Sequence, residues 1–216
     1  MWSEEPDGAP DWRPAVRHLK KADPAMAQLM RQVGPCRLAP RPDPFLTLVA
    51  SIFSQQLSTK GAATLLSRFR DRFPRRQLTP RRVLAALDGG TRSWNDDIIR
   101  ACGISRQKRA YLVDLCEHAI TRRFDPSKLA ALEDEAVIEK LVDIRGVGVW
   151  TAQMYLMFVL CRPDILPVAD LGIQEAAKRH FGLPDRPKAK RLAELAEPWR
   201  PWRTVACWYL WRGLQG

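Results

Sequence analysis

The stretch LVDIRGVGVWTAQ, residues 141–153, places two glycines one position apart between two segments with helical periodicity. A helix that ends near Asp143 or Ile144 can be closed by Gly146, because glycine adopts a left-handed backbone conformation without Cβ strain. A second helix can then begin near Gly148, and its first amide groups attract an anion because they have no intrahelical partner. The stretch therefore predicts a helical hairpin that holds a phosphodiester, with an ordinary turn between two helices as the simpler alternative.

The rest of the chain has the pattern of an all-α protein. Segments with apolar residues at every third or fourth position follow one another, and strand-like alternation is almost absent. Four Asp-Pro or Thr-Pro pairs are typical of helix starts, at residues 23–24, 43–44, 79–80 and 125–126. We therefore expect roughly nine to twelve helices joined by short loops.

The composition predicts an anionic partner. The 216 residues include 35 Lys and Arg against 24 Asp and Glu, a net charge of +11, which favours nucleic acid over a membrane surface. No stretch has the roughly 20 apolar residues of a membrane span, and the N-terminus lacks the features of a signal peptide. The five cysteines are scattered and never in C-x-x-C spacing, which indicates reduced thiols and no zinc or iron–sulfur site.

Four further blocks, taken with the hairpin, resemble DNA-3-methyladenine glycosylase II of the helix-hairpin-helix DNA glycosylase superfamily. They are LVASIFSQQLSTKGAATL (48–65), CGISRQKRAYLVDL (102–115), ILPVADLGIQEAAKRHFG (165–182) and WRPWRTVACWYLWR (199–212). The resemblance implies an all-α fold of two helical lobes with the active-site cleft between them. After a flexible tail of residues 1–12, lobe one would comprise residues 45–155 with the hairpin 141–153, and lobe two residues 13–44 and 156–216.

The resemblance assigns the catalytic carboxylate to Asp170, at the end of the proline-containing loop 162–170. By position alone Asp170 is a helix N-cap, and the two roles are compatible. An alkylated purine is positively charged and leaves readily, so one carboxylate can stabilise the cation-like sugar, at about 3–4 kcal/mol for a preorganised group, or orient the attacking water. Asp164, in the same loop, lies outside the matching position, and we expect it to be solvated.

The position of Trp150 bears on the type of reaction. Relatives with lyase activity carry a lysine there, two residues after the last glycine of the hairpin. The resemblance therefore implies a monofunctional glycosylase, which removes alkylated purines such as 3-methyladenine and 7-methylguanine from duplex DNA and leaves an abasic site for base excision repair. Relatives with an iron–sulfur cluster need four closely spaced cysteines near the C-terminus, where this chain has only Cys207.

Other site residues follow from the same resemblance. The base pocket would contain Trp150, Trp211, Trp208, Gln55 and Met154, although a core role stays open for each tryptophan. An indole face attracts a cationic alkylated base by roughly 0.5–2 kcal/mol, which favours damaged over normal bases. The family often has a tyrosine where this chain has Met154, and this difference leaves the range of substrates open.

The DNA-binding residues would lie in two places. Gln56 would be the wedge that fills the gap left by a flipped nucleotide, with surface solvation as the alternative. The hairpin contacts would come from Arg145, Gly146, Val147, Gly148 and Thr151. Main-chain carbonyls of Val142, Ile144 and Val147 would hold a structural monovalent cation, and no other cofactor is expected.

Two basic segments have no assigned role. Residues 68–82 and the group Arg106, Lys108 and Arg109 either form solvated faces or contact phosphates.

Two functions from other classes remain open at this point. One is a non-catalytic, structure-specific DNA-binding protein that uses the same hairpin, which would need neither Asp170 nor a tryptophan-rich pocket. The other is a helical enzyme acting on a small anionic metabolite, which the charge of +11 disfavours. We expect a monomer that acts on alkylated duplex DNA in a bacterial cytoplasm, with no membrane partner.

Overall fold

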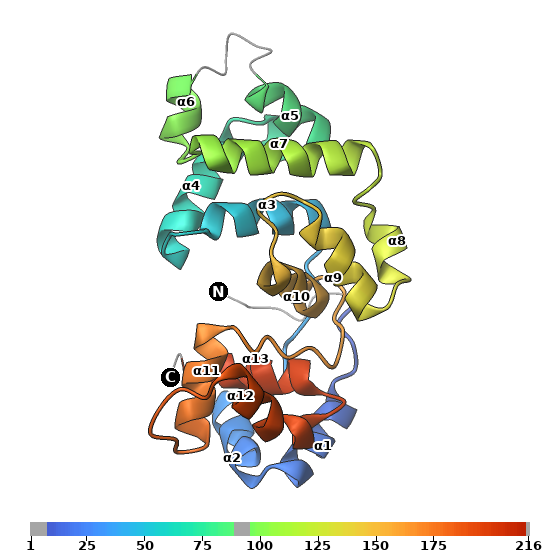
Figure 1. Ribbon diagram of the computed structural model, residues 1–216, viewed down its shortest axis with the longest axis vertical. Coiled ribbons are helices and arrows are strands. Elements are labelled where there is room, and N and C mark those ends of the chain that lie inside the picture. The colour runs from blue at the N-terminus through green and yellow to red at the C-terminus, as the bar shows by residue number, and fades with distance from the viewer. Residues whose placement is uncertain (1–7, 89–95, 215–216) are drawn as a thin grey trace. The chain divides into compact units, whose positions relative to one another are not determined.

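The structure, a computed structural model, describes residues 8–88 and 96–214. These residues form thirteen α-helices and two short 3-10 helices, with no strand among them, which confirms the all-α class (Figure 1). The number of α-helices exceeds the roughly nine to twelve expected, because very short helices contain too few residues to show a period. Examples are α6 (Asp96–Ala101) and α8 (Pro126–Ala130). None of the described helices has the length and apolar character that crossing a membrane requires.

All four helix starts that the sequence predicts are present. In each, the Asp or Thr side chain accepts a hydrogen bond from a backbone N–H of the first turn, and a proline occupies that turn. The helices that begin in this way are α2 (Pro24–Val33), α3 (Pro44–Ser54), α5 (Pro80–Leu87) and α8.

The chain divides into two compact units, residues 1–41 with 156–216, and residues 42–155. We call the first the terminal unit and the second the central unit. These divisions fall near the boundaries expected for the two lobes, and the cleft expected between the lobes stays a prediction. Most of the tail expected at residues 1–12 lies outside the described residues, but Trp12 is buried and its indole N–H donates to the carbonyl of Leu38 at 2.7 Å.

The core of the central unit lies where α7 packs against α5 and α3, and α3 packs against α4 (Figure 1). Phe53, Phe69 and Phe73 form a continuous aromatic cluster, with ring centroids 5.3 and 5.0 Å apart. The elements not yet named are α4 (Thr59–Asp71), η1 (Pro74–Arg76), α7 (Arg106–Ile120), α9 (Asp134–Val142) and α10 (Val149–Phe158), whose last residues belong to the terminal unit.

In the terminal unit, α13 packs against α1, α2 and α11. Its buried centre includes Leu19, Met26, Trp199 and Tyr209, all less than 2% exposed. Asp23 caps α2 and also accepts hydrogen bonds from His180 and Trp199, so one buried carboxylate joins three elements. The elements are α1 (Arg13–Ala22), α2, α11 (Leu171–His180), α12 (Ala189–Leu195), η2 (Glu197–Trp199) and α13 (Arg203–Gly213).

Candidate functional site

The hairpin has the glycine-closed turn that the sequence predicts. Helix α9 ends at Val142, Gly146 has a φ of 81°, and α10 begins at Val149. A Cβ on Gly146 would lie 2.3 Å from the ring of Tyr111, whereas a Cβ on Gly148 would meet nothing within 4 Å. The fold therefore requires glycine at 146, and any requirement at 148 comes from outside the chain.

Two side chains of the central unit anchor this turn. The amide Nε2 of Gln55, at the end of α3, donates to the carbonyl of Gly146 at 2.8 Å. The carboxylate of Asp114, on α7, accepts the backbone N–H of Arg145 at 2.9 Å. This role of Asp114 could not be predicted from a local motif, because Asp114 lies 31 residues from its partner.

The residues expected to bind phosphate differ in exposure. The side chains of Val147 and Thr151 are buried, at 4% and 8%, so any contact with DNA would use their main chain. The hydroxyl of Thr151 lies 3.4 Å from that of Ser51. Arg145 and Gly148 are exposed.

The proposed cation ligands are main-chain oxygens in the same turn. The carbonyl of Ile144 already accepts the N–H of Val147 at 3.0 Å, which leaves one lone pair for another partner. Neutral carbonyl oxygens of this kind suit a hard cation, so the donor set of Val142, Ile144 and Val147 fits the expected ion. The cation site stays a prediction.

Gln56 lies between α3 and α4 in a left-handed conformation, with φ of 60°, and its side chain is exposed. This conformation costs a residue with a Cβ roughly 1–2 kcal/mol, and such cost is often found at functional positions. The next residue, Leu57, is 40% exposed. On α10, Trp150 is 42% exposed and Met154 is half-buried. Their roles as wedge and base pocket stay predictions.

In the terminal unit, Asp170 is the N-cap that its position predicts. Its Oδ1 accepts the backbone N–H of Ile173 at 2.7 Å and the indole N–H of Trp211 at 3.0 Å. The structure thus brings together two of the expected site residues. Trp208 is on the same helix as Trp211 but is buried, with its ring edge-on to Tyr209 at 5.0 Å.

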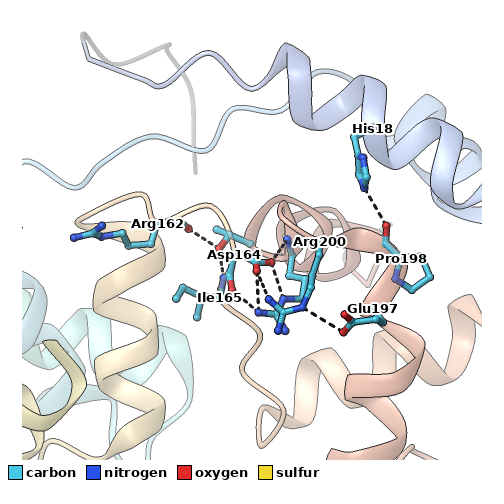
Figure 2. Close-up of polar contacts among 9 residues, drawn as sticks. His18, Arg162, Asp164, Ile165, Glu197, Pro198 and Arg200 are labelled. Atoms are coloured by element: carbon cyan, nitrogen blue, oxygen red, sulfur yellow. Dashed lines mark hydrogen bonds and ion pairs between the residues drawn. The ribbon is translucent and has the colours of Figure 1, made fainter. Parts of the chain in front are cut away.

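The expectation that Asp164 is solvated is wrong. The guanidinium of Arg203 donates to Asp164 through Nε at 2.6 Å and Nη2 at 3.0 Å, and that of Arg200 through Nη1 at 2.7 Å (Figure 2). Thr204 adds two bonds, accepting the N–H of Ile165 at 2.9 Å and donating to the carbonyl of Arg162 at 2.6 Å. These contacts fix the loop that leads to Asp170 onto the start of α13.

Two of the unassigned basic residues, Lys108 and Arg109, are half-buried and hydrogen-bonded to main-chain carbonyls. Lys108 donates to the carbonyl of Phe53 at 2.8 Å, and burial lowers the pKa of its ammonium group. Arg109 donates to the carbonyl of Leu87 at 2.6 Å and pairs with Asp96 at 3.1 Å. Both side chains are thus held by main-chain carbonyls of the central unit, and the alternatives of a solvated face and a phosphate contact stay predictions. Arg106 is exposed.

The cysteines offer no nucleophile at neutral pH. All five are free, and burial raises the pKa of both Cys36 and Cys161 to about 11 and that of Cys116 to about 12. The pKa of Cys102 is raised by burial, and so is that of Cys207. The carboxylate of Asp170 is half-buried, and its catalytic role stays a prediction.

The all-α fold and the glycine-closed hairpin between α9 and α10 are typical of the helix-hairpin-helix class of proteins. Residues 49–201 match the family described as HhH-GPD superfamily base excision DNA repair protein. The chain belongs to this family, and within it to the DNA-3-methyladenine, or alkylbase, glycosylases.

Several relatives are similar over nearly their whole length. The alkylbase DNA glycosidase-like protein mag2 of Schizosaccharomyces pombe is 31% identical over 94% of this chain and 93% of its own. DNA-3-methyladenine glycosylase 1 of the same organism is 33% identical, over 90% of this chain and 84% of its own.

Solved structures agree with this placement. The S. pombe 3-methyladenine DNA glycosylase Mag1 in complex with abasic DNA has a TM-score of 0.80, at 32% identity, over 92% of this chain and 95% of its own. A DNA-3-methyladenine glycosidase from Bacillus halodurans has a TM-score of 0.76, at 36% identity, over 92% of this chain and 88% of its own.

Proposed function

We propose that this protein hydrolyses the N-glycosidic bond of alkylated purines in duplex DNA and leaves an abasic site, without a lyase step. The observation that carries the proposal is the carboxylate of Asp170, held at the start of α11 by two N–H donors. The names of two relatives, the DNA-3-methyladenine glycosylase 1 of S. pombe and the DNA-3-methyladenine glycosidase of Bacillus halodurans, support the same class of substrate.

The chemistry needs little from the protein beyond this carboxylate. Alkylation at N3 or N7 places a positive charge on the purine, so the base leaves without being protonated first. As the bond breaks, positive charge develops on the deoxyribose, and a fixed carboxylate stabilises it by about 3–4 kcal/mol. Asp170 can also orient the water that attacks the sugar carbon.

The other proposed contributions come from the central unit. The turn Arg145–Gly148 binds a backbone phosphate through main-chain N–H groups, with a structural monovalent cation behind it. Gln56 replaces the flipped nucleotide in the duplex, and the exposed face of Trp150 stacks on the extruded cationic base. Because residue 150 is a tryptophan and not a lysine, no Schiff base forms with the sugar at this position.

The remaining parts of the proposal concern the setting. We propose that the protein acts as a monomer, because base flipping needs one cleft and one hairpin. A location in a bacterial cytoplasm, with the DNA, belongs to the same proposal.

The decisive experiment measures free base released from methylated duplex DNA by wild type and by Asp170→Asn, with the strand followed before and after alkali. Wild type should release 3-methyladenine and give strand breaks only after alkali. Asp170→Asn should release no base. It should still bind DNA as tightly as the wild type or more tightly, because a negative charge near phosphate is lost. Asparagine is also a good N-cap, so α11 should stay intact.

Asp43→Asn is the matched control, since Asp43 caps α3 in the same way, accepting the N–H of Leu46 at 2.8 Å. It should release base at the wild-type rate. Unchanged release by Asp170→Asn would remove the assigned role from this residue. A wild-type protein that bound duplex DNA but released nothing would instead be the non-catalytic DNA-binding protein of the alternative interpretation.

A further inference from the structure

The contact between Trp211 and Asp170 is more specific than a pocket wall requires. The indole N–H of Trp211 donates to Oδ1 of Asp170 at 3.0 Å, and the same oxygen accepts the N–H of Ile173 at 2.7 Å. Two donors on one carboxylate oxygen oppose rotation of the carboxylate about its Cβ–Cγ bond. The direction in which the second oxygen points is therefore fixed before any substrate binds.

The indole of Trp211 also contacts the ring of Phe158. The ring of Phe158 lies against that of Trp211, with centroids 5.7 Å apart and planes at 33°. The guanidinium of Arg41 lies 5.2 Å from the centre of the Phe158 ring, and the backbone N–H of Arg41 donates to the backbone carbonyl of Phe158 at 2.8 Å. The stack of Arg41, Phe158 and Trp211 leaves the indole little freedom to swing away from the carboxylate.

Gly172 provides the space that the contact needs. A Cβ at this position would lie 3.0 Å from Oδ1 of Asp170, and 3.1 and 3.3 Å from Nε1 and Cδ1 of Trp211. These separations are shorter than ordinary van der Waals contacts. An alanine at 172 would therefore push the carboxylate and the indole apart, although alanine is the better helix former.

We propose that Trp211 is a positioning residue for Asp170 and not a wall of the base pocket. Gly172 supports this role because it leaves space for the contact between the indole and the carboxylate. The inference rests on the proposed function, since a positioned carboxylate matters only if Asp170 acts on the sugar. The sugar is the same whichever base leaves. Loss of the indole N–H should thus slow release of all bases by a similar factor, whereas loss of a stacking wall should depend on the base.

The test compares Trp211→Phe with Trp199→Phe, two changes that each remove an indole donor to an N-cap aspartate. Trp199 donates to Oδ2 of Asp23 at 3.0 Å, within the same unit, but touches nothing at Asp170 that the structure describes. Single-turnover rates of 3-methyladenine and 7-methylguanine release are measured with saturating enzyme, and the dissociation constant for the same duplexes is measured separately. The temperature is kept well below the unfolding midpoint of each variant.

Trp211→Phe should lower the single-turnover rate roughly 10- to 100-fold for both bases, with an unchanged dissociation constant, because a small displacement of a reacting group has effects of this size. Gly172→Ala should also lower the single-turnover rate for both bases, although it keeps the tryptophan. Trp199→Phe should lose thermal stability but keep the wild-type rate. The indole ¹⁵N–¹H resonance of Trp211 should move in Asp170→Asn and stay in place in Asp23→Asn.

Each other outcome has a distinct meaning. Wild-type rates in Trp211→Phe, or a loss that affects one base much more than the other, would overturn the positioning role and leave the proposed function standing. A Trp211 indole resonance that does not move in Asp170→Asn would also overturn the positioning role and leave the proposed function standing. Wild-type protein that releases no base would overturn the proposed function, and the positioning role would fall with it.

Discussion

At the scale of single residues, the two glycines of the hairpin occupy their positions for different reasons. The fold itself requires glycine at position 146, because the residue has a positive φ and a Cβ there would clash with the ring of Tyr111. Gly148 has open space around the position of a Cβ and no positive φ. If DNA approaches the turn, Gly148 is where a side chain would obstruct it.

Substitutions should separate these causes. Gly146→Ala should destabilise the protein by roughly 2–4 kcal/mol, from left-handed strain and overpacking together. Gly148→Leu should leave the free energy of unfolding nearly unchanged but weaken binding to all DNA sequences alike. Chemical denaturation and titration of unrelated duplexes check both effects, and a binding loss confined to DNA with one damaged base would contradict the phosphate role.

At the scale of elements, the loop before α11 depends on α13. Asp164 and Arg203 are 21% and 14% exposed, so their paired hydrogen bonds are partly shielded from water. Arg203→Lys keeps the charge but loses the planar fork. It should lower the free energy of unfolding by about 1–3 kcal/mol and slow base release, because the loop ends at Asp170.

Arg191→Lys is the control for that experiment. Arg191 pairs with Glu194 at 3.2 Å, but both side chains are at least half exposed. Its replacement should change stability by less than about 0.5 kcal/mol and leave base release unchanged. Equal effects of the two substitutions, measured by denaturation and by base release, would contradict the role assigned to Asp164.

The carboxylate of Asp23 joins α2, α11 and η2 and makes their packing sensitive to acid. Burial, the largest single influence, raises the pKa of Asp23, but hydrogen bonds from His180, Trp199 and the Met26 N–H outweigh it, so the pKa lies below the usual 3.8. A folded-state pKa below the unfolded one stabilises the fold above the unfolded pKa. That stabilisation is lost as the pH falls through the folded-state value.

Asp23→Asn should therefore cost about 1.5–3 kcal/mol at neutral pH. The difference from wild type should narrow once the pH falls below 3.8, where the carboxylate of the wild type begins to be protonated. Urea denaturation from neutral pH to below 3.8 measures the difference in the free energy of unfolding between the wild type and Asp23→Asn. A difference that stays constant into acid would mean that the ionised form of Asp23 contributes nothing to the packing.

At the scale of the whole molecule, the net charge of +11 predicts how the protein finds DNA. Each phosphate contact releases counterions, so the logarithm of the binding constant should fall linearly with the logarithm of salt concentration, at a slope of about −0.9 for each contact. Fluorescence anisotropy with undamaged duplexes measures this slope. A binding constant that does not respond to salt would mean that phosphate contacts contribute little to DNA binding.

The features that could be predicted from the sequence are those that depend on near neighbours. Asp23, Asp43, Thr79 and Asp125 each cap the helix that starts one residue later, and Gly146 closes α9 within four residues of its end. The all-α class follows from apolar residues repeating within one helical turn. All of these signals need only a few consecutive residues.

The features that the sequence could not supply join residues far apart in the chain. Asp164 appeared to be a solvated loop residue because its partners, Arg200 and Arg203, lie 36 and 39 residues later. The hydrogen bonds of Lys108 and Arg109 could not be predicted, because Phe53 and Leu87, whose carbonyls accept them, lie in other helices. The hydrogen bond from Trp211 to Asp170 joins residues that are 41 positions apart, so no local pattern predicts it.

By itself, therefore, the sequence determined the helical class, the helix starts, the turn of the hairpin and the family, because backbone conformation and motif spacing are local properties. Only the tertiary structure decided which charges are paired and that the indole of Trp211 donates to Asp170. Hydrogen bonds between helices depend on packing, and packing brings together atoms of residues that are far apart along the chain.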